Sequence, residues 1–324
     1  MPGACCGTYA SGMSGDGSTI VGDAYVALNS SKTEAYRWTA AGGYQLLGDL
    51  GSASSGSAAY ATSFDGSVVV GEAPVGTNTF GAFRWTASQG MMALPLLFAY
   101  AVTDDGTMVA GENNWWKTSR QTGTFGSCSD SQIGLSMVDL SADGSVAAGS
   151  GAFGTPFMGN FTNAYRSTPT GNCQNIDGHS RNSDAGGISA DGQVIVGEEQ
   201  IGGPYLAFRW TASTGMVDLG DLGGGLSRAD ATNRDGSVVV GHSLTSGSTG
   251  SAQAFIWTAK CGIQDLQTVL EKQGAKIPNG WILQIATDIS EDGTVIAGYG
   301  LSPPRAGFKF GQTEPFRAVL PVPC

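Results

Sequence analysis

The sequence is poor in charged residues and histidine, and it lacks a long apolar run. Of its 324 residues, 13% are charged and two are histidine. No apolar run approaches the ~20 residues that cross a bilayer. The opening MPGACCGTYASG has neither the basic nor the apolar region of a signal peptide. We therefore expect a soluble domain without membrane insertion, with any export signal outside this stretch of chain.

Positive charge is also scarce. The chain has 16 Lys and Arg against 27 Asp and Glu, which gives a formal net charge of -11. Because phosphate groups are bound mainly by Lys and Arg, this balance argues against nucleic acid and anionic lipid surfaces as partners. Neutral or cationic ligands fit this composition better.

Familiar catalytic and metal-binding motifs are missing. The sequence has no CxxC, HExxH, GxSxG, Walker loop or EF-hand spacing. The Gly-rich LGGGLS and GDLGG lack a strand-to-helix context, so they are interpreted as turns. We expect no cofactor. Calcium stays open, because carbonyls and scattered Asp are calcium ligands, but no motif requires it.

The chain does contain 51 glycines and a repeated Asp-Gly turn that precedes apolar strands such as SVVVG. The seven turn aspartates are Asp16, Asp65, Asp105, Asp143, Asp191, Asp235 and Asp292. Their spacings of 49, 40, 38, 48, 44 and 57 residues match four-stranded propeller blades. Asp-Gly supplies the positive φ of a tight hairpin, and each copy continues with strands like AFRWT and GMVDL. The sequence predicts an all-β fold, a single seven-bladed β-propeller of four-stranded antiparallel blades.

The repeat also sets approximate blade limits. The blades are expected at 8–51, 52–94, 95–130, 131–178, 179–224, 225–270 and 271–324. The last copy is long enough for a third strand but short for a fourth. Residues 1–7 are therefore expected to add the missing outer strand and close the ring of a monomer. The Trp of each RWT segment is expected to pack between blades.

The cysteines are Cys5, Cys6, Cys128, Cys173, Cys261 and Cys324. An even number of scattered cysteines in a Lys-poor chain favours disulfides, and hence an extracellular or cell-surface protein. Cys5 or Cys6 is expected near Cys324 at the ring closure. Cys128 and Cys173 are expected to bridge adjacent blades, which leaves Cys261 for the remaining N-terminal cysteine. Six cysteines allow 15 pairings, so the sequence does not decide among them.

The segments DGSVVVG, AFRWT and LGDLGG resemble the HAF repeat of bacterial secreted and cell-surface proteins, including some autotransporter passengers. The match covers nearly the whole chain. Residues 266–300 resemble the terminal unit of such proteins, with a short helix ahead of GW. The resemblance implies an extracellular β-propeller, but it assigns no single activity and no catalytic residues. The third copy departs most, with GENNWWKTSRQTGTFGSCSDS where an AFRWT strand is expected.

One residue follows each VVVG-like strand, and we expect it at a rim of variable loops, where specificity usually resides. These residues are Asp23, Glu72, Glu112, Ser150, Glu198, His242 and Tyr299. A functional interpretation is a carboxylate ring for a cation, a basic ligand or acid and base chemistry on a sugar. The structural interpretation is an ion pair within each blade. It would join Asp23 to Arg37, Glu72 to Arg84 and Glu198 to Arg209.

His242 and Tyr299 depart from this pattern, which makes them the candidate catalytic residues. Together they could act as base and acid in β-elimination from a uronate, with Arg305 binding the carboxylate. Alternatively, they could simply hydrogen-bond a ligand. His179, in NIDGHSRNSD, is expected on the surface.

The segment NNWWK is the most conspicuous loop candidate. An indole can cover a sugar ring while the amides of Asn113 and Asn114 bind hydroxyls, with Lys117 beside them. The alternative is that one of Trp115 and Trp116 replaces the missing Trp of RWT. Adjacent strand residues face opposite ways, so one can be buried and the other exposed.

The sequence thus predicts a secreted or cell-surface binding module that recognises glycan or another extracellular ligand on the rim formed by the variable loops. Its candidate ligand-binding residues are Trp115, Trp116, Asn113, Asn114, Lys117, Glu112, Glu198, Glu199 and Arg305. An alternative is a polysaccharide lyase or glycoside hydrolase that uses His242, Tyr299 and the rim carboxylates. A third is a structural passenger of a bacterial surface protein.

Overall fold

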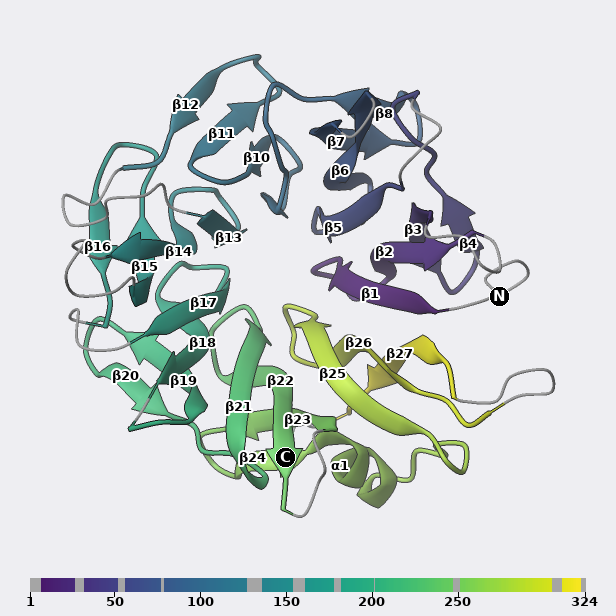
Figure 1. Ribbon diagram of the computed structural model, residues 1–324, viewed down its shortest axis with the longest axis vertical. Helices are drawn as coiled ribbons and strands as arrows, with labels where there is room; N and C mark the ends of the chain where they lie inside the picture. The colour runs from purple at the N-terminus through teal and green to yellow at the C-terminus, as the bar shows by residue number, and fades with distance from the viewer. Residues whose placement is uncertain are drawn as a thin grey trace.

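Seven antiparallel sheets surround a central axis, each with its first strand innermost (Figure 1). The structure is a computed structural model that describes residues 7–26, 32–51, 56–76, 79–126, 136–153, 161–177, 182–200, 202–246, 251–304 and 311–321. We call the sheets blades one to seven in chain order. The predicted all-β, seven-bladed propeller is confirmed.

Six blades have four strands each, paired in sequence order. Blades one to three consist of β1 (Thr8–Met13), β2 (Thr19–Tyr25), β3 (Thr33–Thr39) and β4 (Gly43–Leu46); β5 (Ala58–Thr62), β6 (Val68–Gly76), β7 (Thr79–Thr86) and β8 (Gly90–Ala93); and β9 (Ala101–Val102), β10 (Met108–Ala110), β11 (Asn114–Lys117) and β12 (Thr122–Thr124). Blades four to six consist of β13 (Ser136–Leu140), β14 (Ala147–Phe153), β15 (Phe161–Ser167) and β16 (Cys173–Asn175); β17 (Ser183–Ile188), β18 (Val194–Gln200), β19 (Tyr205–Thr211) and β20 (Gly215–Asp218); and β21 (Gly223–Thr232), β22 (Val238–Thr245), β23 (Ala252–Thr258) and β24 (Gly262–Asp265). Among the described residues, blade seven has three strands: β25 (Ile282–Ile289), β26 (Val295–Leu301) and β27 (Thr313–Val319).

The Asp-Gly turns join the first two strands of each blade, and the Asp side chain holds each turn. In the first turn, Asp16 Oδ1 accepts hydrogen bonds from the Ser14 hydroxyl at 2.6 Å and the Ser18 N–H at 2.8 Å. Gly17 has a φ of 69°, a left-handed conformation that favours glycine. The turn signal read from the sequence thus corresponds to a real structural unit.

The residues at these turns also connect neighbouring blades. The N–H of Phe64 donates to the carbonyl of Asp104 at 3.0 Å. The other N–H to C=O bonds run from Asp16 to Phe64, Asp104 to Ala142, Ala142 to Ala190, Ala190 to Arg234, Arg234 to Glu291 and Glu291 to Gly15. Together they form a closed ring of backbone hydrogen bonds that includes the junction between blade seven and blade one.

The glycine that ends each VVVG run allows the first two strands to approach closely. A Cβ on Gly197 would lie 2.0 Å from the carbonyl oxygen of Asp184, and one on Gly241 would lie 2.0 Å from that of Arg228. Any larger residue would displace the innermost strand, so glycine is required by space at these positions.

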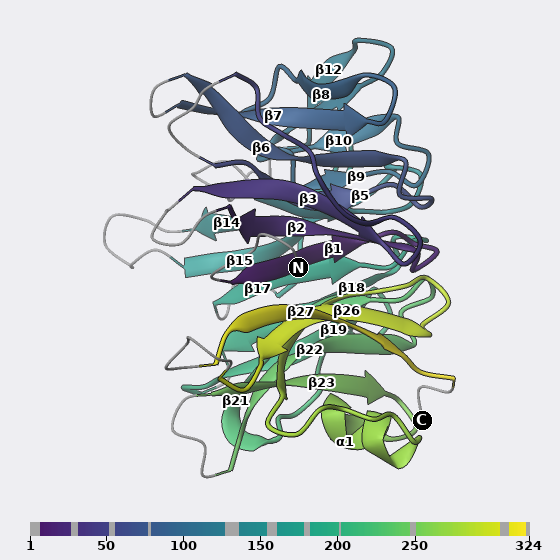
Figure 2. The ribbon, with the colours of Figure 1, turned by 90° about the vertical axis from the view of Figure 1, so that its right-hand side faces the viewer.

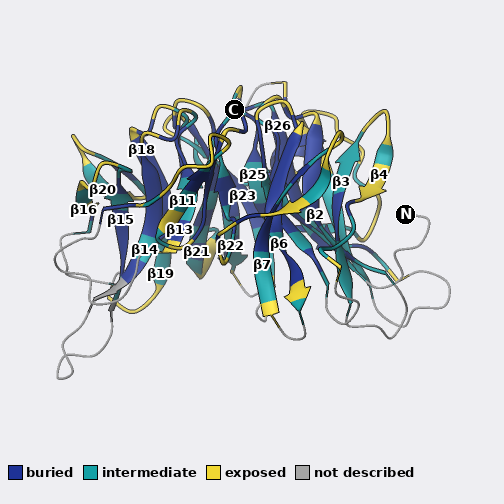
Figure 3. Ribbon diagram, turned by 90° about the horizontal axis from the view of Figure 1, so that it is seen from above, coloured by how far each residue is buried: buried dark blue, intermediate teal, exposed yellow. Residues whose placement is uncertain are grey.

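The core consists of layers between blades. Val21 and Ala35 of blade one pack with Val69, Phe83 and Trp85 of blade two, and all five are buried. Figure 3 shows buried residues concentrated in the strands and exposed residues concentrated in the turns. Trp85 and Trp210 are buried, as expected for the Trp of RWT.

A short helix, α1 (Leu266–Lys272), lies at the edge of the ring beside blades six and seven (Figure 2). Asp265 caps it by accepting the N–H of Thr268 at 2.6 Å. Leu266, Val269 and Leu270 are buried, which is the spacing of one helical face. The short helix implied by the HAF-repeat resemblance is therefore present.

The predicted closure by residues 1–7 differs from the structure at Gly7. The Gly7 carbonyl accepts the N–H of Tyr25 at 3.3 Å, so Gly7 extends the innermost strand of blade one. It does not pair with β27 of blade seven. Residues 1–6 lie outside the described part of the chain.

Both cysteines in the described ranges, Cys173 and Cys261, are disulfide-bonded. Each predicted pairing involves a cysteine outside those ranges, so the pairings stay predictions. No helix among the described residues is long and apolar enough to cross a membrane.

Candidate functional site

The innermost strands carry irregularities that turn side chains toward the axis. The register shifts between Ala59 and Ala61 in β5 and between Ala229 and Ala231 in β21. Tyr60 and Asp230 are therefore bulged residues, and a β-bulge redirects a side chain. Equivalent positions in all blades line an axial cavity of about 190 Å³: Ser11, Tyr60, Tyr100, Val138, Gly186, Asp230 and Thr287.

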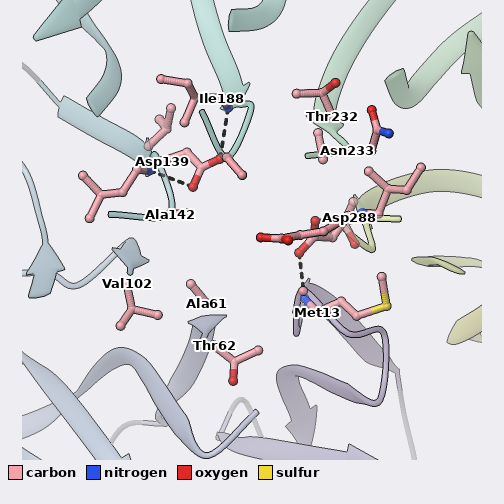
Figure 4. Close-up of a pocket in the computed structure, with 18 of the residues that line it drawn as sticks. Met13, Ala61, Thr62, Val102, Asp139, Ala142, Ile188, Thr232, Asn233 and Asp288 are labelled. Carbon is pink, nitrogen blue, oxygen red and sulfur yellow. Dashed lines mark hydrogen bonds between the residues drawn. The ribbon is translucent and has the colours of Figure 1, made fainter. Parts of the chain in front are cut away.

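Two half-buried carboxyl groups lie in the wall of this cavity, on different sides of it (Figure 4). Asp288 accepts the N–H of Met13, in blade one, at 2.7 Å. Asp139 accepts the N–H of Ile188, in blade five, at 3.0 Å. Burial raises the pKa of Asp139 to about 6 and that of Asp288 to about 7. Each carboxyl group thus ties its blade to the next one.

The Asp-Gly turns narrow one end of the cavity. Arg234 of blade six contacts Glu291 of blade seven at 2.5 Å and Asp104 of blade three at 3.7 Å. Because blades three and six lie on opposite sides of the ring, this guanidinium reaches across the axis.

A chain of charged side chains begins beside the cavity in blades five and six. Arg228 Nε lies 3.1 Å from Asp230 Oδ1, and Arg228 Nη1 lies 3.0 Å from Glu198 Oε1. His242 Nδ1 lies 2.8 Å from Asp230 Oδ2. His242 and Arg228 are direct cross-strand partners, so the sheet register places both beside Asp230.

The Asp230 carboxylate orients the imidazole of His242. A carboxylate at Nδ1 fixes the proton there and leaves Nε2 of the neutral ring as an acceptor. The His242 side chain is 20% exposed, so it is partly accessible to solvent. The group can therefore bind a ligand hydroxyl or accept a proton.

Tyr299 lies in the neighbouring blade. Burial raises the pKa of its hydroxyl, and the Asp230 carboxylate adds to that shift. Its ring meets that of Tyr9 edge to face, with centroids 5.2 Å apart. No hydrogen bond joins Tyr299 to His242 in the described ranges. The structure thus brings both residues near Asp230 but does not pair them.

Tyrosines and carboxylates occupy the opposite part of the ring. The Tyr60 hydroxyl donates to Glu72 at 2.6 Å, and the rings of Tyr60 and Tyr100 are 5.5 Å apart. Burial, followed by the Glu72 charge, raises the pKa of Asp23 to about 6. This side of the site combines half-buried aromatic faces with negative charge.

The predicted ion pairs within blades are wrong. Asp23 lies opposite Ala35 in the sheet, whereas Arg37 lies opposite Val21. The guanidinium of Arg37 instead donates to the carbonyl of Gly66 in blade two at 3.0 Å. The same offset separates Glu72 from Arg84 and Glu198 from Arg209, since each acid lies opposite an alanine.

Most residues after VVVG are also not at the loop rim; Glu112 is the exception, because it is exposed and lies between β10 and β11. Asp23, Glu198, His242 and Tyr299 lie within second strands and continue the row of apolar side chains that faces the next blade. Strand alternation causes this placement, because each lies two residues beyond a buried Val or Ala. They are therefore half-buried between blades.

The Trp pair of blade three is structural. Trp116 lies opposite Val109 in the position that Trp210 has opposite Ile195, and it is buried. It therefore replaces the missing Trp of RWT. Trp115 is half-buried and packs into the layer between blades three and four, with Lys117 Nζ 5.4 Å from its ring centroid. The predicted exposed indole is not present.

The other predicted ligand-binding residues are dispersed. Glu112 and Asn114 are exposed, Asn113 is half-buried and Glu199 is buried. Arg305 and His179 lie outside the described residues. Within the described residues, Glu198 and His242 of the predicted set belong to the connected charged network.

Sequence reasoning missed Arg228 and Asp230. Their segment, RADAT, carries charges where other innermost strands read YASGM or AAYAT. That departure from the repeat was the available signal. The described residues contain no group of three or more His, Cys, Asp or Glu placed to hold a metal ion.

No protein-family model matches the chain, and no curated protein matches it in sequence. Solved structures are similar in fold. A puromycin hydrolase aligns with a TM-score of 0.59 and 16% identity over 97% of this chain and 52% of its own. An oligogalacturonate lyase in complex with manganese aligns with a TM-score of 0.58 and 13% identity over 98% of this chain and 90% of its own. An oligogalacturonate lyase from Vibrio parahaemolyticus aligns with a TM-score of 0.58 and 10% identity over 98% of this chain and 91% of its own. At these identities the likeness shows the propeller fold alone.

Proposed function

We propose that this propeller is a secreted or cell-surface binding module that takes a glycan or another extracellular ligand at its axis. The observation that carries the proposal is the Arg228–Asp230–His242 network beside the axial cavity. It brings three partly buried polar side chains into direct contact. At the position of Arg228, blades one, two, four and seven have Tyr9, Ala58, Ser136 and Ile285, so the repeat does not require a cation there.

The chemistry of the site suits a polyhydroxylated or cationic ligand. Tyr60 and Tyr100 offer aromatic faces on which a sugar ring can stack. Glu72 and Asp230 offer carboxylate acceptors for hydroxyl or ammonium groups. Aromatic faces with a few convergent polar groups are typical of small-ligand sites.

A uronate fits less well. Arg228 already contacts both Glu198 and Asp230, so its positive charge is compensated. The cavity is also lined by Asp104, Asp139, Asp288 and Glu291 against one arginine, Arg234, so its wall is acidic and disfavours an anion. We therefore place neutral and amino sugars ahead of uronates.

The export that this function requires is supported by the disulfides of Cys173 and Cys261, because such bonds persist in oxidising compartments. The resemblance of DGSVVVG, AFRWT and LGDLGG to the HAF repeat agrees with the same location. Fractionation of the native host, followed by antibody detection, tests it. Recovery of the protein from the cytoplasm alone would refute it.

A polysaccharide lyase or hydrolase is the second candidate, because Asp230 orients His242 at 2.8 Å in the manner of a general base. Tyr299, in the next blade, is the corresponding candidate acid. The two functions differ in one readout. An enzyme releases reducing or unsaturated ends, whereas a binding module retains the polymer without cleaving it.

The test is retention and product release on a panel of neutral, amino and uronate polysaccharides. We expect retention without products, reduced about tenfold or more by His242→Ala and by Asp230→Asn. Lys260→Ala, in an exposed turn, is the matched control and should bind normally. Products that disappear in His242→Ala would establish an enzyme. Equal retention by the wild type and all variants would show that the ligand does not bind at this site.

A further inference from the structure

A groove of about 490 Å³ lies between blades two and three. Blade two supplies Met92 of β8 and, just after this strand, Leu94 and Pro95, whereas blade three supplies Trp116 and Thr118. All residues that line the groove belong to the unbroken described range 79–126. Sites for single small molecules have volumes of about 300 to 1,000 Å³. The groove is therefore large enough for one small ligand.

The charged side chains of this groove are both cationic. Arg84 and Arg120 line it, and its lining contains no acidic residue. Among the described residues, no carboxylate forms an ion pair with either guanidinium. The chain as a whole has a net charge of -11, but salt screens exposed charges beyond about 10 Å. The two arginines therefore make this groove locally positive.

Arg84 is one of the arginines that link blades, but its link is longer than that of Arg209. Its Nε and Nη2 lie 3.4 and 3.3 Å from the same carbonyl oxygen of Gly106, whereas Arg209 Nε lies 2.8 Å from that of Gly236. Burial lowers the pKa of both arginines, and for Arg209 the carboxylate of Asp235 opposes this change. A guanidinium has five N–H donors, so Arg84 can donate to a further acceptor.

Arg120 has a backbone conformation that favours glycine. Its φ is 64°, and it is the single non-glycine residue with a positive φ among the described residues. The equivalent hairpin of blade four has Gly171 there, with a φ of 100°. The two hairpins share a hydrogen bond, from Arg120 N–H to the Lys117 carbonyl at 2.8 Å and from Gly171 N–H to the Thr168 carbonyl at 3.1 Å. Non-glycine residues in this conformation concentrate at ligand sites.

The second cation is specific to this boundary between blades. The pairing of the third and fourth strands defines the positions equivalent to Arg120 in the other described hairpins: Gly42, Gln89, Gly171, Thr214 and Cys261. None of these residues is cationic. The repeat therefore explains Arg84 as a link between blades, but it does not explain Arg120.

We propose that this groove binds a small organic carboxylate, with its carboxylate group held by Arg84 and Arg120 and its apolar part against Met92 and Pro95. Arginine suits this ligand because a planar guanidinium donates two parallel hydrogen bonds to a carboxylate. Gln89 also lines the groove and can bind a polar substituent. The groove shares no lining residue with the axial cavity, so this site is independent of the proposed glycan site.

The test is isothermal titration calorimetry of the chain with naphthylacetate at low salt. We expect saturable binding at one site per chain. Naphthylacetamide, which has the same rings without the charge, should bind at least tenfold more weakly. Acetate, which has the charge without the rings, should also bind at least tenfold more weakly. Added sodium chloride should weaken the binding of naphthylacetate.

Arg120→Gly separates a ligand contact from a structural role. Glycine adopts a positive φ without strain, so this variant should unfold at about the temperature of the wild type. Its affinity for naphthylacetate should nevertheless fall at least tenfold. Arg84→Ala should reduce affinity to the same extent. Arg209→Ala, which removes the equivalent link in blade five, is the matched control and should bind normally.

Absence of naphthylacetate binding to the wild-type chain would overturn the proposal. Equal affinity of folded Arg120→Gly and the wild type, or of the carboxylate and its amide, would do the same. An equal loss in Arg84→Ala and Arg209→Ala would attribute the effect to loosened blades and also contradict the site. Retention of polysaccharide at the axis should be unchanged in Arg120→Gly, so failure here leaves the proposed function to its own test.

Discussion

Arg209 of blade five donates its Nε–H to the carbonyl oxygen of Gly236, in the Asp-Gly turn of blade six, at 2.8 Å. The same bond recurs from Arg37 to Gly66, Arg84 to Gly106, Arg166 to Gly192 and Arg317 to Gly17. Blades three and six have Trp115 and Ile256 at the equivalent position. The Arg of each RWT-like segment is thus a link between blades.

Removal of one such link should destabilise the ring. We expect Arg209→Ala to lower the free energy of unfolding by about 1 to 2 kcal/mol, because a hydrogen bond from a charged donor is lost. Urea unfolding monitored by tryptophan fluorescence measures it. Lys260→Ala, an exposed cation, should change stability by less than about 0.5 kcal/mol. Equal effects of the two variants would contradict the role of the link.

The close spacing of the first two strands of each blade predicts that a side chain added at the glycine between them lowers stability. Gly197→Ala places a Cβ 2.0 Å from the carbonyl oxygen of Asp184, so the innermost strand must move. We expect a loss of about 1 to 3 kcal/mol in the free energy of unfolding. At Gly76 the nearest atom would be 3.8 Å from a Cβ, and Gly76→Ala should be nearly neutral. A neutral Gly197→Ala would show that the strands are less closely packed than described.

The half-buried carboxyl group of Asp288 predicts how stability depends on pH. Burial raises its pKa to about 7 from the ordinary 3.8. A proton held more tightly in the folded state favours folding at low pH, and this contribution is lost as pH rises from 3.8 through about 7. Asp288→Asn should therefore flatten the decline over this range, by on the order of 1 to 4 kcal/mol.

The measurement is the free energy of unfolding at several pH values between about 4 and 8. The wild type should lose stability toward the upper end, and the Asn variant should lose less. Below this pH range, the aspartates of the Asp-Gly turns change the free energy of unfolding in the opposite direction. Hydrogen bonds from Ser67 hold the pKa of Asp65 below its ordinary value, so its contribution is lost as pH falls. Parallel profiles for wild type and Asp288→Asn would contradict a raised pKa at this residue.

A substitution in the Trp pair of blade three distinguishes a structural role of this segment from a role in ligand binding. Trp116→Ala should cost about 3 to 5 kcal/mol of stability, because a buried indole is removed. Its retention on any glycan bound by the wild type should stay unchanged below the unfolding transition. Thermal unfolding and affinity electrophoresis provide the two readouts. Loss of retention in the folded Trp116→Ala variant would show that the ligand binds at this segment of blade three.

The fold could be predicted from the sequence because the Asp-Gly turns recur along the chain. Asp-Gly pairs at intervals of 38 to 57 residues define hairpins, and Val or Ile runs after each turn define buried strands. Both signals are local, so each copy reveals its own blade. The Trp substitution in blade three was predictable for the same reason, because NWWK occupies the place of a strand in a known register.

The site was less predictable, because its contacts join different blades. Acid and Arg occur together in the repeat, but strand register offsets Asp23 from Arg37 by two residues. The acceptor of Arg37 is a backbone carbonyl, which has no sequence signature. Asp230 reaches the axis because a bulge shifts the register of β21, and the same shift recurs in β1, β5, β13, β17 and β25. The hydrophobic pattern of the sequence predicts neither the backbone acceptor nor the bulge.

Hydrogen–deuterium exchange with and without a retained polysaccharide tests the axial site most directly. Ligand should slow exchange in the innermost strands β5 and β21, which carry Tyr60 and Asp230. Asp230→Asn should reduce this protection, while residues 112–117 exchange equally in both states. Protection confined to residues 112–117, with no change at the axis, would contradict the account.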